Sequence, residues 1–236
     1  MLVPDDVERF VPEDLRRTYE VISVRGAAAL LHTNHRDLFE ELLVSLREFT
    51  FPEAYAVKAG GNGSQITATF KEIFQKKGWK ETRIAADLLV KKYHGKKLTK
   101  PVEEFMLEGF VGGHKIDFVK DRLAVDFEWN SKDQTYDRDL YAARAFYECG
   151  VIDAFVIVTR SEALDAMFAR LGISKKYGAS TTWMGKLLPR IAGGRNGGCP
   201  VLIFGITPEI VTASPAGEVM AAAAEPDVPV ADDDDA

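Results

Sequence analysis

Three acidic residues, Asp117, Asp126 and Glu128, are spaced so that a β-hairpin would bring their carboxylates together. Residues 115–119 and 123–129 both alternate apolar and polar side chains, which is the period-two pattern of strands. A two-residue turn between them would place Asp117 directly opposite Asp126. Glu128 would then lie one pleat further along the same face of the sheet.

Carboxylates gathered on one strand face repel each other, so this arrangement is destabilising unless a cation compensates the charge. A ligand set made only of oxygen atoms favours a hard ion such as Mg²⁺, which takes one or two carboxylates together with waters and phosphate oxygens. Such an ion can activate water for phosphodiester hydrolysis. The alternative is a solvated polar face that Lys115 and Lys120 neutralise.

Two polar segments are candidates for reading DNA, because polar side chains that reach base edges supply sequence recognition. The first follows the acidic strand directly, and the second lies at the expected start of a helix, where backbone N–H groups also favour a phosphate. Turn formation and helix capping, with Asp133 as a natural N-cap, explain the same residues equally well. The candidates are Asn130, Ser131 and Lys132 in the first segment, and Ser180 and Thr181 in the second.

The acidic hairpin and its surroundings resemble the BglII/BstYI family of type II restriction endonucleases, a branch of the PD-(D/E)XK nucleases. The resemblance covers roughly residues 60–210 and is carried mainly by the hairpin and the Trp-Asn-Ser-Lys-Asp run at 129–133. The Tyr-Gly-Ala-Ser-Thr-Thr-Trp segment at 177–183 and the Gly-Gly-Cys-Pro sequence at 197–200 support it.

The resemblance implies roles for the hairpin residues. Asp117 and Asp126 correspond to the two metal-binding acids, and the backbone carbonyl of Phe127 to a further ligand. Glu128 stands where many nucleases of this superfamily have lysine and where the BglII branch has glutamine or glutamate. Its role stays open between base, ligand of a second metal and orienter of the attacking water. The run Asn130–Lys132 corresponds to the recognition segment of the family.

The implied activity is Mg²⁺-dependent hydrolysis of double-stranded DNA at a palindromic site, centred on GATC. A homodimer would match the two-fold symmetry of such a site. The functional partner would be a cognate DNA methyltransferase that protects the host. Two other functions are compatible with the same residues: a non-catalytic DNA-binding or regulatory protein that has kept the fold, and a structure-specific repair nuclease.

Strand and helix patterns alternate along the chain, which predicts a mixed α/β fold whose central sheet is flanked by helices, as the resemblance also implies. We expect a single nuclease domain over 1–211, with its catalytic core at about 60–210, and a disordered acidic tail over 212–236. The strands are expected at 19–25, 83–93, 115–119, 123–129, 151–159 and 200–206, and the helices at 36–50, 64–77, 134–149, 161–171 and 181–192.

The formal net charge of −6 does not exclude DNA binding, because seven of the 36 acids lie in residues 217–236, which contain no base. Binding depends on the local field, and a near-neutral body can carry a basic cleft. Five lysines between 91 and 100 either guard an edge strand or contact phosphates. Glu104 and Glu108 either complete the acidic site or form surface ion pairs.

The chain has no apolar stretch near the roughly 18 residues that a membrane helix needs. Its first residues, Met-Leu-Val-Pro-Asp-Asp, lack the basic and apolar regions of a signal peptide. The two cysteines, Cys149 and Cys199, are expected to be buried free thiols in a reducing compartment. The sequence thus predicts a cytoplasmic protein without a membrane partner.

Overall fold

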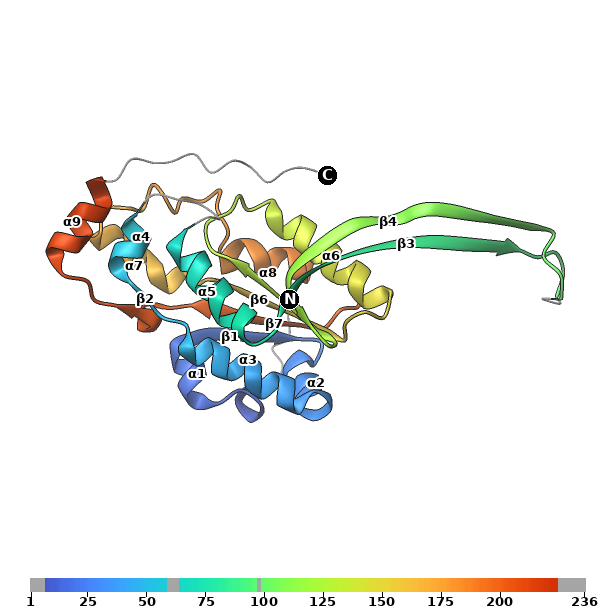
Figure 1. The fold of residues 1–236 in the computed structure, drawn as a ribbon, viewed down its shortest axis with the longest axis horizontal. Helices are drawn as coiled ribbons and strands as arrows, with labels where there is room; N and C mark the ends of the chain where they lie inside the picture. The colour runs from blue at the N-terminus through green and yellow to red at the C-terminus, as the bar shows by residue number, and fades with distance from the viewer. Residues whose placement is uncertain (1–6, 59–63, 97–98, 225–236) are drawn as a thin grey trace.

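The computed structural model describes residues 7–58, 64–96 and 99–224. Six strands form one sheet in the order β1-β7-β6-β5-β4-β3 (Figure 1). β5, β6 and β7 run parallel to one another, and the remaining neighbours are antiparallel. The strands are β1 (Tyr19–Val24), β3 (Lys80–Lys92), β4 (Glu103–Lys120), β5 (Leu123–Glu128), β6 (Ala154–Arg160) and β7 (Val201–Ile206). The predicted mixed sheet is confirmed.

Helices pack on both faces of this sheet and complete the mixed α/β architecture (Figure 1). The helices of the described residues are α1 (Glu13–Thr18), α2 (Ala27–Asn34), α3 (Arg36–Glu48), α4 (Glu53–Val57), α5 (Gln65–Lys76), α6 (Thr135–Glu148), α7 (Asp165–Arg170), α8 (Met184–Ala192) and α9 (Ala216–Ala224). A separate short pair joins β2 (Phe51–Pro52) to β8 (Val211–Thr212), and single 3-10 turns lie at Val7–Arg9, Glu162–Leu164 and Pro208–Ile210.

Two apolar clusters sandwich the sheet. On one face α3 and α5 pack on the hairpin strands, where Phe70 of α5 stacks on Phe127 with ring centroids 4.1 Å apart. On the other face Leu140 of α6 and Leu187 of α8 pack against β6 and β7. Every residue of β5, β6 and β7 is buried, as expected for parallel strands covered on both sides.

β3 and β4 continue beyond the body of the molecule as a long two-stranded ribbon, which we call the arm (Figure 1). The strands stay paired out to Lys92 and Glu103, with register shifts between Ile84 and Leu88. At one shift Asp87 accepts the N–H of Gly109, which adopts a positive φ of 63° that favours glycine. The sequence predicted the strand at 83–93 but not that it would leave the core.

Several local expectations are confirmed. Ser64 caps α5, because its Oγ accepts the N–H of Thr67. Ser161 likewise accepts the N–H of Ala163 at the start of the 3-10 turn that leads into α7. The strands at 19–25 and 200–206 and the helix at 36–50 appear within a few residues of the expected bounds.

Others are wrong. The disorder expected from residue 212 onward does not begin there, since α9 forms at Ala216–Ala224 and packs Ala222 on α4 beside Ala54 and Val57. An alanine-rich run with few competing polar groups favours a helix once an apolar surface is available to it. Residues 225–236, which contain six of the seven tail acids, lie outside the described residues.

The cysteine expectation is half right: Cys199 is buried, Cys149 is exposed, and both are free thiols. In the described ranges, no helix combines the length and the apolar character needed to cross a bilayer.

Candidate active site

The hairpin forms with the register that the acid spacing predicted. β4 pairs with β5 so that Phe118 lies opposite Val125, and Asp121 occupies the left-handed region (φ 47°) in the two-residue turn. One step beyond the paired residues, the N–H of Asp117 donates to Oδ1 of Asp126 at 2.9 Å. The Asp126 side chain thus accepts an N–H that a backbone carbonyl would accept in a regular ladder. The two acids lie next to each other where the pairing of β4 with β5 ends.

The acidic face of β5 is buried, so the alternative of a solvated polar face is wrong. Asp126 is 4% exposed and Glu128 7% exposed. Ala124, on the same face, packs in the cluster that contains Leu140 of α6. Of the two lysines expected to neutralise the acids, Lys120 instead binds Glu41 at 2.7 Å. Lys115 pairs with Glu81 at 3.2 Å, and its charge opposes the rise in the pKa of Asp117.

Burial and mutual repulsion oppose ionisation of these acids. Burial is the largest effect on all of them, and it raises the pKa of Asp117 and raises that of Asp126 well above its usual range. The charge of Asp117 raises the pKa of Asp126 further. Burial raises the pKa of Glu128 to about 7, although hydrogen bonds from Ser131 and Asp139 act in the opposite direction.

A fourth acid, Asp139 of α6, joins this group and was not predicted. It is 4% exposed, and burial followed by the charges of Glu128 and Asp126 raises its pKa well above the usual range. The sequence carried a signal for it, because Asp139 lies on the apolar stripe of its helix beside Leu140 and Ala143. A carboxylate on a core-facing stripe needs a partner or a function.

The acids suit a divalent cation. Within the described residues, three buried side-chain oxygens lack a hydrogen-bond partner, and all belong to this region: Glu128 Oε2, Asp139 Oδ2 and Asn130 Oδ1. Each accepts hydrogen bonds, so a water, a bound cation or, for the two carboxyls, a proton would satisfy it. Among the described residues, no group of three or more His, Cys, Asp or Glu side chains is arranged to hold a metal ion by itself. Two carboxylates plus waters and substrate oxygens, the set that Mg²⁺ prefers, need no such group.

The predicted site residues are therefore placed as follows. Asp117, Asp126 and Glu128 come together, and Phe127 lies between the two acids of β5 with its ring packed on Phe70 and its backbone paired with Val158. Glu104 does not complete the site. It lies in the distal arm, where it binds Lys91 at 3.3 Å, 13 residues and on the order of 40 Å of strand from Asp117.

The two candidate DNA-reading segments, almost 50 residues apart in the chain, lie side by side. Lys132 forms a bridge with Thr181, and the N–H of Asp133 donates to the carbonyl of Ser180 at 2.9 Å. The N–H of Thr182 donates to the carbonyl of Ser131 at the same distance. We call residues 130–133 with 180–182 the platform. The sequence placed both segments near the site but did not predict their contact.

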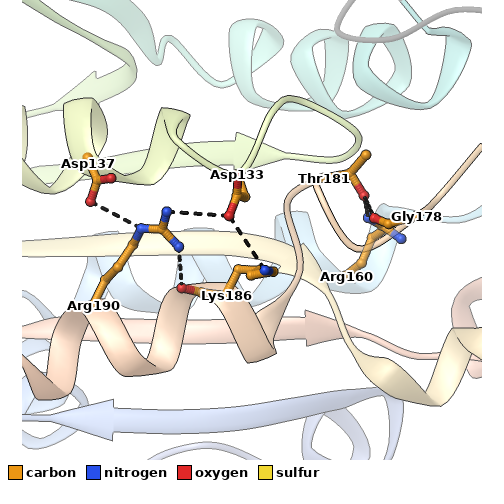
Figure 2. Close-up of polar contacts among 7 residues, drawn as sticks. All are labelled: Asp133, Asp137, Arg160, Gly178, Thr181, Lys186 and Arg190. Atoms are coloured by element: carbon orange, nitrogen blue, oxygen red, sulfur yellow. Dashed lines mark hydrogen bonds and ion pairs between the residues drawn. The ribbon is translucent and has the colours of Figure 1, made fainter.

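The platform is not built from helix caps. α8 begins at Met184, so Ser180 and Thr181 precede the helix instead of starting it. Gln134 stands at the N-cap of α6, and no side chain caps it. Asp133 instead binds Arg190 of α8 at 3.4 Å and Lys186 at 3.8 Å (Figure 2).

Arg160, at the end of β6, forms hydrogen bonds both to the platform and to the residue that precedes it. Its Nε donates to the carbonyl of Trp129 at 2.7 Å, and its Nη2 donates to Thr181 Oγ1 at 2.5 Å (Figure 2). The guanidinium is buried within 6.0 Å of the ring centroids of Trp129, Phe168 and Tyr177. Burial lowers its pKa to about 10, which still leaves it charged at neutral pH. This buried arginine was not singled out from the sequence.

Comparison with known proteins agrees with this geometry. A family model described as restriction endonuclease BglII/BglIII matches residues 19–206, which include the sheet, the acids and the platform. No curated protein matches the chain.

Proposed function

Because the chain belongs to the BglII/BglIII family of restriction endonucleases and is thus a type II, site-specific deoxyribonuclease, we propose that it hydrolyses both strands of a palindromic DNA site in a Mg²⁺-dependent reaction. The target is centred on GATC, and the active form is a homodimer that matches its two-fold symmetry. A cognate DNA methyltransferase protects the host.

The observation that carries this proposal is the gathering of Asp117, Asp126 and Glu128 where the hairpin ladder opens, with buried oxygens that lack donors. Asp117, Asp126 and the carbonyl of Phe127 would hold the cation. When bound, the ion supplies an activated water and stabilises charge on the phosphate oxygens.

The protein's own residues supply the remaining functions. Asp117 and Asp126, which as carboxylates repel a phosphate, would contribute by fixing where the cation lies on the hairpin. Glu128, whose pKa of about 7 suits proton transfer at neutral pH, accepts a proton from the attacking water or orients it. The buried setting of these acids keeps bulk water from screening their charges.

Sequence recognition is assigned to the platform. Lys132 and Ser180 are exposed there, and Asn130 and Thr181 are partly exposed. The bridge between the two segments lets them present polar groups to the same stretch of a groove. Because Arg160 binds Trp129 and Thr181 together, the base-reading groups and the acidic strand keep a fixed separation, which sets where cleavage falls relative to the site read.

The test is incubation of the purified protein with unmethylated phage DNA and Mg²⁺. We expect discrete bands that disappear with EDTA and in Asp117→Asn. The cleavage rate of the variant should fall by at least about 10³-fold, because a bound metal stabilises the charge of the transition state by several kcal/mol. Asp121→Asn is the matched control, because it removes an exposed acid from the turn of the same hairpin and asparagine tolerates the left-handed backbone.

Sequencing the ends of the fragments would give the target. Intact DNA that is nonetheless retarded in a gel would overturn the catalytic proposal in favour of a binding protein. Cutting of branched substrates alone would point to repair.

A further inference from the structure

Asp139 is the one acid of the site that comes from a helix and not from the hairpin. Its Oδ2 is buried without a hydrogen-bond partner in the part of the chain that the structure describes, and its Oδ1 lies 3.5 Å from Nε of Arg138. The Arg138 side chain is 63% exposed, so it compensates the buried carboxyl only in part. A buried acid that is only partly compensated opposes folding, so its presence indicates a function, and that function should involve the group it contacts.

Its contact is Glu128. The Glu128 side chain has hydrogen-bonding neighbours on two elements, Ser131 just after β5 and Asp139 on α6. Its Oε2 has no partner among the described residues. The buried oxygens without partners in the described chain, Glu128 Oε2 and Asp139 Oδ2, belong one to each acid, and a hydrogen bond between two carboxyls requires a proton on one of them. Glu128 is therefore held from two directions, by Ser131 and by Asp139.

We propose that Asp139 is a positioning residue, which holds the Glu128 carboxyl in place for its role toward the attacking water. The inference rests on the proposed function and adds a fourth acid to the site, borne by α6. A flexible glutamate has three side-chain torsions, and a contact on one side only would leave the carboxyl free to turn away. Misplacing a reacting group by about 1 Å can cost about 100-fold in rate.

A purely structural role makes the opposite prediction for stability. Asp139 lies among Glu128, Asp126 and Asp117, whose charges all act against its ionisation. Replacing it by a neutral residue removes that repulsion, so the fold should gain or keep stability while the reaction slows. If Asp139 were retained only for packing, its replacement would lower both the stability of the fold and the rate of cleavage.

The experiment compares Asp139→Ala and Asp139→Asn with the wild-type protein in Mg²⁺-dependent cleavage. For Asp139→Ala we expect kcat to fall by about 10- to 100-fold, as for partners that orient catalytic ligands, with KM for DNA unchanged. Asp139→Asn retains a donor to Glu128 and should recover most of the loss. Both should keep the thermal midpoint of the wild-type protein or exceed it. Glu148→Gln, an exposed acid of the same helix paired with Arg144, is the control and should behave as wild type.

A double-mutant cycle identifies Glu128 as the group acted upon. In a Glu128→Gln background, measured under single turnover with enzyme in excess, Asp139→Ala should reduce the rate by no more than about twofold. Independent, multiplying losses would overturn the proposal, as would a raised KM or a lower midpoint in Asp139→Asn. If wild type and Glu148→Gln cleave and Asp139→Ala cleaves equally well, this inference alone fails. A wild-type protein that does not cleave overturns the proposed function and the inference with it.

Discussion

The two ends of β4 both contain large apolar residues, but these residues are buried at one end and exposed at the other. At the core end Ile116 is fully buried and Phe118 is 4% exposed. In the arm, Phe105 is 41%, Met106 51% and Phe110 58% exposed on the same strand. Apolar residues alone therefore do not indicate burial. The helices α5 and α6 cover the core end, whereas neither of the main apolar clusters extends over these arm residues.

The acids and bases of the two ends differ in the same way. Asp117 at the core end faces Asp126, and no base among the described residues forms an ion pair with it; burial raises its pKa, although the charge of Lys115 acts in the opposite direction. In the arm two pairs of opposite charges face each other across the ribbon, Lys91 with Glu104 at 3.3 Å and Lys92 with Glu103 at 2.7 Å. The acids with raised pKa values lie at the end of the strand where we propose the active site, and the paired charges lie at the solvated end.

The largest expected difference between the two ends concerns stability. Phe118→Ala removes a ring that packs on Phe70 and Phe74 and should lower the free energy of unfolding by about 3–5 kcal/mol. Phe105→Ala, the matched arm variant, should change it by no more than about 0.5 kcal/mol, since the ring is already exposed. Urea unfolding followed by circular dichroism measures both. An equal loss in Phe105→Ala would mean that the arm is packed against another surface in solution.

The second difference is the dependence of stability on pH in the absence of metal. The pKa values of Asp126, Glu128 and Asp139 are raised in the folded protein. At a pH above their unfolded pKa values of about 4 and below their folded ones, the unfolded chain has released protons that the native protein still holds. The free energy of unfolding should therefore fall as pH rises from about 4.5 to about 7, by up to about 1.4 kcal/mol per pH unit for each proton.

Mg²⁺ should reverse this loss, and more strongly at pH 8 than at pH 5.5, because the cation competes with protons for the same oxygens. Thermal midpoints with and without Mg²⁺ measure the effect. Asp139→Asn should flatten the pH profile, and Glu104→Gln in the arm is its control. A stability that rises steadily over this pH range would contradict the arrangement of the acids.

The smallest expected effect distinguishes the two explanations of the arm lysines. Because Lys91 and Lys92 already bind Glu104 and Glu103, we expect the double change Lys91→Gln and Lys92→Gln to alter DNA affinity by less than about threefold. The slope of log affinity against log salt should stay the same. Two lost phosphate contacts would instead reduce that slope by about 1.8. Lys97, in the same cluster, lies outside the described residues.

The sequence predicted much of the site because strand periodicity is a local property. The alternation at 115–119 and 123–129, with a two-residue turn, was enough to place Asp117 beside Asp126, and the structure has that register. The continuous apolar run after residue 151 likewise predicted a strand buried on both faces. For the buried strand the side-chain pattern follows from backbone geometry within a few residues. On β4 the alternation breaks at a register shift with β3, so Ile116 and Phe118 pack in different clusters.

What the sequence by itself determined is the identity of the acidic hairpin and the family whose residues it resembles. The tertiary structure decided which polar groups are buried and which distant segments meet. Asp139 joined the acids because α6 packs over β5, and the segments around Lys132 and Thr181 met because Arg160 and α8 hold them together. It also decided that β3 and β4 leave the core as an arm. These outcomes depend on long-range packing, and no local pattern of residues encodes which surface a helix or a loop will cover.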